Sequence, residues 1–102
     1  MLTIKGIHKL IGEGFVDDRF LFTNFEETPT HLRFWFNDID DKIPEGGVWV
    51  EIEREGKYDA KYGYKMYWVT YPNCPEHRIG AKYFCDMDNV RWTFETALKK
   101  QP

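Results

Sequence analysis

The segment HLRFWFN, residues 31–37, alternates apolar side chains with polar, charged or indole side chains. Successive side chains of a β-strand point to opposite faces, so this alternation predicts a half-buried strand. The side chains predicted for its buried face are Leu32, Phe34 and Phe36. The other face would carry Arg33 and Trp35 between His31 and Asn37. An indole among charges is either covered by another element or belongs to a binding surface.

Two further segments, 48–54 and 64–71, repeat this alternation and predict two more strands of the same kind. The side chains predicted for the buried face are Val48, Val50 and Ile52 in the first segment, and Tyr64, Met66 and Trp68 in the second. The side chains predicted to point away are Trp49, Glu51 and Glu53, followed by Lys65, Tyr67, Val69 and Tyr71. All three strands would therefore expose an aromatic side chain among charged ones.

The rest of the chain supplies the other elements of the fold. Strand-like runs rich in β-branched and aromatic residues occupy 15–26, 31–37, 47–54, 63–71 and 79–85. Their short connections indicate antiparallel neighbours, whereas 72–75 is predicted to be a rigid loop. Aromatic residues fall on both faces of 15–26, which favours a central strand.

The C-terminal segment 86–100 has a helical pattern instead, with Val90, Phe94, Ala97 and Leu98 on one stripe and Trp92 opposite. We therefore predict an α+β fold, with an antiparallel sheet of five or six strands and one C-terminal helix. The sheet could be open or curled into a small barrel.

Length and composition indicate one globular domain over residues 1–102. The chain is 42% hydrophobic, 30% charged and 18% aromatic, a balance that supports a packed core. It has no apolar run of membrane-spanning length and no signal-peptide pattern, so we expect a cytoplasmic protein that does not associate with a membrane. Cys74 and Cys85 are too few for a disulfide framework. The sequence leaves open whether the protein is a monomer or a dimer paired through an edge strand.

An aromatic patch with an acidic flank leads to the first functional hypothesis. The expected anchors are Arg33, Trp35, Trp49 and Tyr67, and the expected flank is Asp38, Asp40, Asp41 and Glu45. Trp, Tyr and Arg carry most of the binding energy in protein interfaces. We therefore predict a non-catalytic protein-binding module that needs no cofactor. By analogy of class alone, it would be a small inhibitor or modulator, of the phage-encoded kind, of a nucleic-acid-handling host protein.

Basic and aromatic residues interleave between 57 and 71, which supports an alternative function. The residues concerned are Lys57, Tyr58, Lys61, Tyr62 and Lys65. Single-stranded nucleic acids bind where bases stack on rings and phosphates meet cations. The net charge of −3 counts against this alternative, because nucleic-acid-binding domains are usually basic.

A third hypothesis is a small cysteine- or zinc-dependent enzyme built on Cys74, His77 and Cys85. Thiolates and imidazole suit zinc, and a thiolate near a base can act as a nucleophile. The spacing of these residues matches no established zinc or nucleophile motif, and the chain contains no phosphate loop, G-x-S-x-G or H-E-x-x-H motif. We therefore expect no enzymatic activity and no bound metal.

Overall fold

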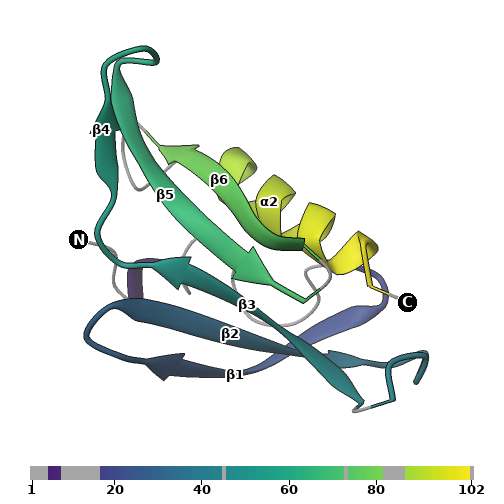
Figure 1. Ribbon diagram of the computed structural model, residues 1–102. Coiled ribbons are helices and arrows are strands. Elements are labelled where there is room, and N and C mark those ends of the chain that lie inside the picture. The colour runs from purple at the N-terminus through teal and green to yellow at the C-terminus, as the bar shows by residue number, and fades with distance from the viewer. Residues whose placement is uncertain (1–4, 8–16, 45, 73, 82–86, 102) are drawn as a thin grey trace.

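The computed structural model describes residues 5–7, 17–44, 46–72, 74–81 and 87–101 of the chain. After a helical turn at 5–7 it contains six strands and a helix (Figure 1). They are β1 (Phe20–Glu27), β2 (His31–Asp38), β3 (Gly47–Glu53), β4 (Lys57–Asp59), β5 (Tyr64–Tyr71), β6 (Cys74–Ala81) and α2 (Met87–Lys99). The antiparallel sheet and the C-terminal helix are confirmed, and the sheet is open, not closed into a barrel.

The order of the strands is β1-β2-β3-β5, with β4 and β6 also paired to β5. β3 pairs with the C-terminal part of β5, and β4 pairs with its N-terminal part. β3 and β4 thus act as one strand interrupted at 54–56. Gly56 lies in this interruption, directly against the ring of Tyr67, where any Cβ would collide with the ring carbons.

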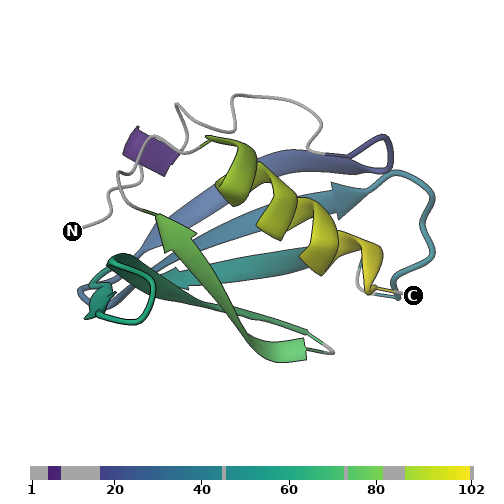
Figure 2. The same cartoon turned by 90° about the horizontal axis from the view of Figure 1, so that it is seen from above.

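The helix covers one face of the sheet, which we call the helix face. Figure 2 shows α2 lying across β1, β2 and β3. The expected stripe is confirmed, since the buried residues of α2 include Val90, Phe94, Ala97 and Leu98. The Phe94 ring centre lies 5.4 Å from that of Phe34 and 5.9 Å from that of Phe36. We call the opposite side the open face, because none of the described residues places a helix on it.

The predicted faces are confirmed for β2 and β3 but reversed for β5. Val69 pairs with Ile52 of β3, which places it on the helix face with Tyr67 and Tyr71. Tyr64, Met66 and Trp68 consequently lie on the open face. Both sets of β5 contain large apolar or aromatic side chains, so alternation alone could not distinguish them.

β1 lies at an edge of the sheet, so the prediction of a central strand is wrong. A bulge between Phe22 and Asn24 shifts the register, and both Phe22 and Phe25 therefore point to the helix face. Their rings stack with centres 6.5 Å apart. Phe25 remains 45% exposed because it lies at this edge.

The last strand lies earlier in the chain than the predicted range 79–85. β6 begins at Cys74, inside the segment expected to be a loop, and ends at Ala81. Pro75 lacks an amide donor, yet it is tolerated because β6 pairs with β5 alone among the described strands. The three-residue strand β4 was not expected at all.

Candidate functional site

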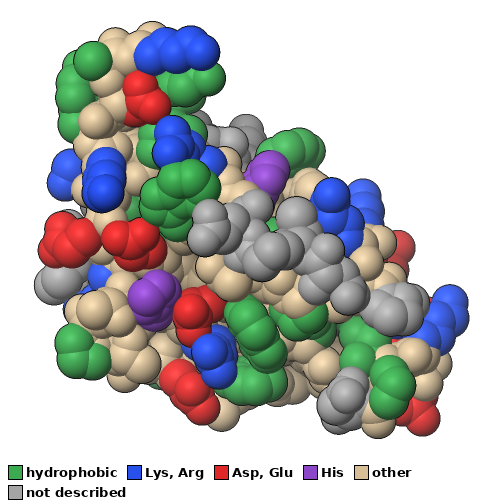
Figure 3. All heavy atoms as spheres, viewed as in Figure 1, with side chains coloured by type: hydrophobic (Ala, Val, Ile, Leu, Met, Phe, Trp, Pro, Cys, Tyr) green, Lys and Arg blue, Asp and Glu red, His purple; other side chains and the backbone are tan. Residues whose placement is uncertain are grey.

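Tryptophans from three strands lie on the open face: Trp35 on β2, Trp49 on β3 and Trp68 on β5. Each is half-buried. Trp35 and Trp49 are directly opposite each other in the register of β2 and β3. Figure 3 shows hydrophobic side chains among Lys, Arg, Asp, Glu and His side chains over these strands. The open face is therefore a mixed aromatic and charged surface.

A first cluster forms around Arg33, and we call it the Arg33 cluster: Arg33, Trp35, Trp49 and Glu51. The guanidinium carbon of Arg33 lies 4.7 Å from the ring centre of Trp49 and 5.8 Å from that of Trp35. Its Nη2 and Nε lie 2.8 and 2.9 Å from Oε2 of Glu51. Cation–π attraction and a charge-assisted hydrogen bond therefore fix the guanidinium against the two indoles.

His31 adds an imidazole at the edge of this cluster. Its Nε2 lies 3.9 Å from Oε1 of Glu51, and its Nδ1 lies 2.7 Å from the hydroxyl of Thr30. The side chain of Arg33 is 33% exposed and that of Glu51 is 18% exposed. The cluster is thus held in place by its own contacts and still reaches solvent.

A second cluster, the Arg78 cluster, contains Arg78, Trp68 and Asp59. The guanidinium carbon of Arg78 lies 4.2 Å from the ring centre of Trp68, and its Nη1 lies 3.2 Å from Oδ2 of Asp59. The ion pair crosses β5 and links β6 to β4. Beside it is a pocket of about 190 Å³, lined by Lys57, Tyr58, Asp59, Met66, Trp68 and Arg78.

Tyr67 does not belong to the exposed surface, so its prediction as an anchor is wrong. Only 2% of Tyr67 is exposed, because β5 turns this side chain toward the helix face. Burial raises the pKa of its hydroxyl, and the charge of Glu55 acts in the same direction. Tyr67 is a core residue.

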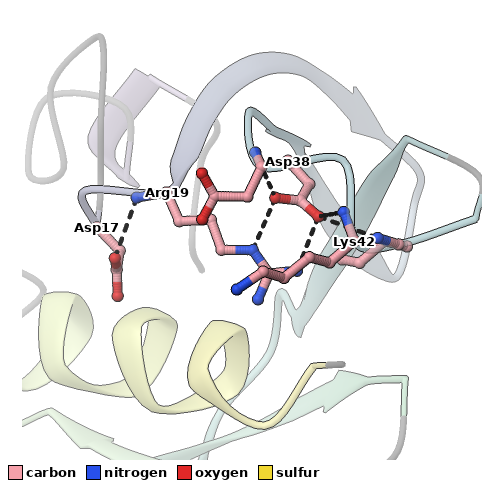
Figure 4. A network of polar contacts seen from close by, with 6 residues as sticks. Asp17, Arg19, Asp38 and Lys42 are labelled. Atoms are coloured by element: carbon pink, nitrogen blue, oxygen red, sulfur yellow. Dashed lines mark hydrogen bonds and ion pairs between the residues drawn. The ribbon is translucent and has the colours of Figure 1, made fainter.

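Asp38 is also structural, which corrects its prediction as part of an acidic flank. Its carboxylate accepts hydrogen bonds of 2.7 Å from both Nε and Nη2 of Arg19 (Figure 4). The backbone amides of Asp40, Lys42 and Ile43 also donate to it. The Arg19 hydrogen bond is the largest cause that holds the pKa of Asp38 well below its usual range. The sequence could not distinguish this buried acid from its neighbours.

The other residues of the predicted acidic flank lie in the turn after β2 or outside the described part of the chain. Asp40 and Asp41 are exposed in the turn that follows β2, at the end of the strand nearer Trp35. Asp41 has a φ of 52°, a conformation that Asp tolerates better than most residues. Glu45 lies outside the described residues.

The structure divides the residues of the nucleic-acid hypothesis between two faces. Tyr58 and Tyr62 are 67% and 50% exposed. Tyr58 pairs with Lys65, so these two side chains share the face of Tyr67. Lys57 pairs with Met66 and shares the open face with Trp68. Sequence reasoning missed Tyr64, Met66 and Trp68 because it reversed the faces of β5, and it missed Arg78 because the last strand was predicted at 79–85.

The described residues provide little support for the cysteine and zinc hypothesis. The ring of His77 packs near that of Trp92 on α2, with centres 5.9 Å apart. The side chain of Cys74 and all of Cys85 lie outside the described residues. Within the described ranges, no three His, Cys, Asp or Glu side chains are grouped closely enough to hold a metal ion.

Comparison of the chain with known protein families, with curated proteins and with solved structures finds no match. No described helix has the length and apolar character needed to span a membrane.

Proposed function

We propose that this protein is a non-catalytic binding module whose Arg33 cluster docks on the surface of a partner protein. The observation that carries the proposal is the guanidinium of Arg33 held against Trp35 and Trp49 on the open face. Trp and Arg dominate the residues whose truncation weakens protein interfaces. Because the cluster is already fixed by its own contacts, binding needs little further ordering of these side chains.

The charges around the cluster favour a basic partner. Glu26 is opposite Arg33 in the register of β1 and β2, and Glu53 is opposite His31 in that of β2 and β3. Together with Glu51, these carboxylates outnumber the single guanidinium of the cluster. Complementary charge speeds encounter and selects partners. A groove that holds nucleic acid is basic, so we propose that the module occupies such a groove and inhibits a nucleic-acid-handling protein.

The test begins by cross-linking the full chain to its partner in cells of its source and purifying that partner. Binding of Trp35→Ala and Trp49→Ala is then measured by calorimetry. Each substitution should weaken binding by about 2 kcal/mol or more, roughly 30-fold. Trp92→Ala is the matched control, since Trp92 is 55% exposed on α2, away from the open face.

Thermal melting shows whether each variant is folded. If folded Trp35→Ala and Trp49→Ala bind as tightly as the unaltered chain, the proposal is wrong. It is also wrong if Trp92→Ala weakens binding as much as they do.

A further inference from the structure

A row of apolar and aromatic side chains follows β5 on the open face, away from the Arg33 cluster. It starts in the turn before β5 and includes every second residue: Tyr62, Tyr64, Met66 and Trp68. The ring centres of Tyr62 and Tyr64 are 5.9 Å apart. Residues two apart on a strand are separated by about 6.6 Å, so Tyr64, Met66 and Trp68 offer regularly spaced apolar surfaces, which Tyr62 extends into the turn.

The row is packed closely against the backbone of β6. A Cβ at Gly80 would collide with the ring of Tyr64 and would lie 2.9 Å from the sulfur of Met66. Both side chains therefore lie over Gly80, in space that only glycine leaves empty. This packing fixes the middle of the row while Tyr62 stays 50% exposed.

Cations accompany the row along its whole length. The Lys61 ammonium lies 5.2 Å from the ring centre of Tyr62, Lys57 lines the pocket, and Arg78 stacks on Trp68. The acid among these groups is Asp59, whose Oδ2 accepts from Arg78 and whose Oδ1 accepts from the Lys61 amide. Asp59 therefore offsets the charge of Arg78. Glu53 lies beside Trp68 in the register of β3 and β5, so the positive surplus of Lys57 and Lys61 is confined to the β4–β5 end of the row. Figure 1 shows that this β4–β5 end projects from the rest of the molecule.

We propose that this row binds single-stranded nucleic acid. One base stacks on Tyr62, a second enters the pocket over Met66 and Trp68, and the phosphates between them meet Lys57 and Lys61. A pocket of about 190 Å³ is below the 300–1,000 Å³ typical of drug-sized ligands, but it suits a fragment such as one base. Ring platforms beside cations are the usual means of holding single strands.

The proposal is independent of the protein partner, because it uses a different part of the open face. It also commits to a short site. Glu53, which the register of β3 and β5 places beside Trp68, repels phosphate at that end of the row, so the nucleic acid contacts the row over only a few nucleotides.

The first measurement is fluorescence anisotropy of a labelled ten-residue oligothymidylate titrated with the full chain at several salt concentrations. Two phosphate contacts predict a slope of about −1.4 for log K against log salt, at about −0.7 per contact on single strands. The double variant Lys57→Gln/Lys61→Gln should lose most of this slope.

The matched control is Lys65→Gln/Lys99→Gln. It removes the same charge, but Lys65 lies on the opposite face of β5 and Lys99 lies at the end of α2. It should bind with an unchanged slope. If both double variants lose the slope equally, or if the unaltered chain does not bind at low salt, the proposal is overturned.

The second measurement separates base stacking from attraction to any polyanion. Tyr62→Ala should weaken binding about tenfold and Tyr62→Phe should not, because stacking needs the ring and not the hydroxyl. An abasic strand of the same length should bind at least tenfold more weakly than oligothymidylate. Equal binding of the two strands would overturn the proposal in favour of a general polyanion site.

Discussion

The two faces of the sheet both carry aromatic side chains from β2, but these side chains differ in type and in cover. On the helix face, Phe34 and Phe36 are completely or almost completely buried and lie against Phe94. On the open face, Trp35 and Trp49 are half-buried and lie against Arg33. Phe has no polar atom to satisfy, whereas Trp combines an apolar ring with an N–H donor that suits a partly wet surface. The choice between the two residue types thus distinguishes core from surface.

The ion pairs of the two faces differ in the same way. Asp38 ends the helix-face row of β2, and its side chain is fully buried against Arg19. Glu51 pairs with Arg33 on the open face, where both side chains reach solvent. A buried acid that loses its partner is left without hydration, whereas an exposed one is not. The helix face should therefore determine stability, and the open face should contribute little to it.

The largest expected effect on stability comes from truncating a side chain of α2 that covers the helix face. Phe94→Ala should lower the free energy of unfolding by about 3–5 kcal/mol, because it leaves a cavity between α2 and two rings of β2. Urea denaturation measures this change. Trp92→Ala, on the exposed side of the same helix, should change it by less than about 1 kcal/mol. Equal losses for the two variants would contradict the assignment of the helix face.

A smaller effect is expected from the buried acid at the end of β2. Asp38→Asn keeps the shape of the side chain but removes the charge that pairs with Arg19, so the melting temperature should fall by about 5–10 °C. The pKa of Asp38 is lowered by folding. Its contribution to stability is therefore complete above the unfolded pKa, near 4, and is lost as the pH falls below that value.

Thermal melts between pH 7 and pH 2 test the sign of this dependence. The unaltered chain should lose stability below about pH 4, and Asp38→Asn should lose less over the same interval. A curve for Asp38→Asn parallel to that of the unaltered chain would contradict the structural role of Asp38.

The sequence predicted much of this fold because β2 and β3 alternate between clearly apolar and clearly polar residues. The same reasoning failed for β5, where Tyr67 and Trp68 are both aromatic and only the pairing of Val69 with Ile52 decides the face. That pairing is a tertiary contact and leaves no local signal. The bulge that turns Phe25 to the helix face is likewise set by pairing with β2.

The candidate sites were predictable to a similar extent. Arg33, Trp35 and Trp49 could be grouped because neighbouring strands brought them together. Arg78 could not be grouped with Trp68, because the sequence predicted the last strand at 79–85 and β6 in fact spans Cys74–Ala81. Asp38 and Asp40 look alike in sequence, and only the approach of Arg19, 19 residues earlier in the chain, makes one of them a buried structural acid.

The smallest effect on stability, and the sharpest test of the comparison, comes from Arg33. Arg33→Gln removes an ion pair that reaches solvent, so the free energy of unfolding should change by less than about 1 kcal/mol in urea denaturation. Arg33→Lys keeps the charge but loses the flat guanidinium that lies against both indoles. If stacking holds the cluster together, the two variants should change the near-ultraviolet circular dichroism of the tryptophans equally. A loss of 3 kcal/mol or more in either variant would show that the open face is a second core, and the contrast between the two faces would then fail.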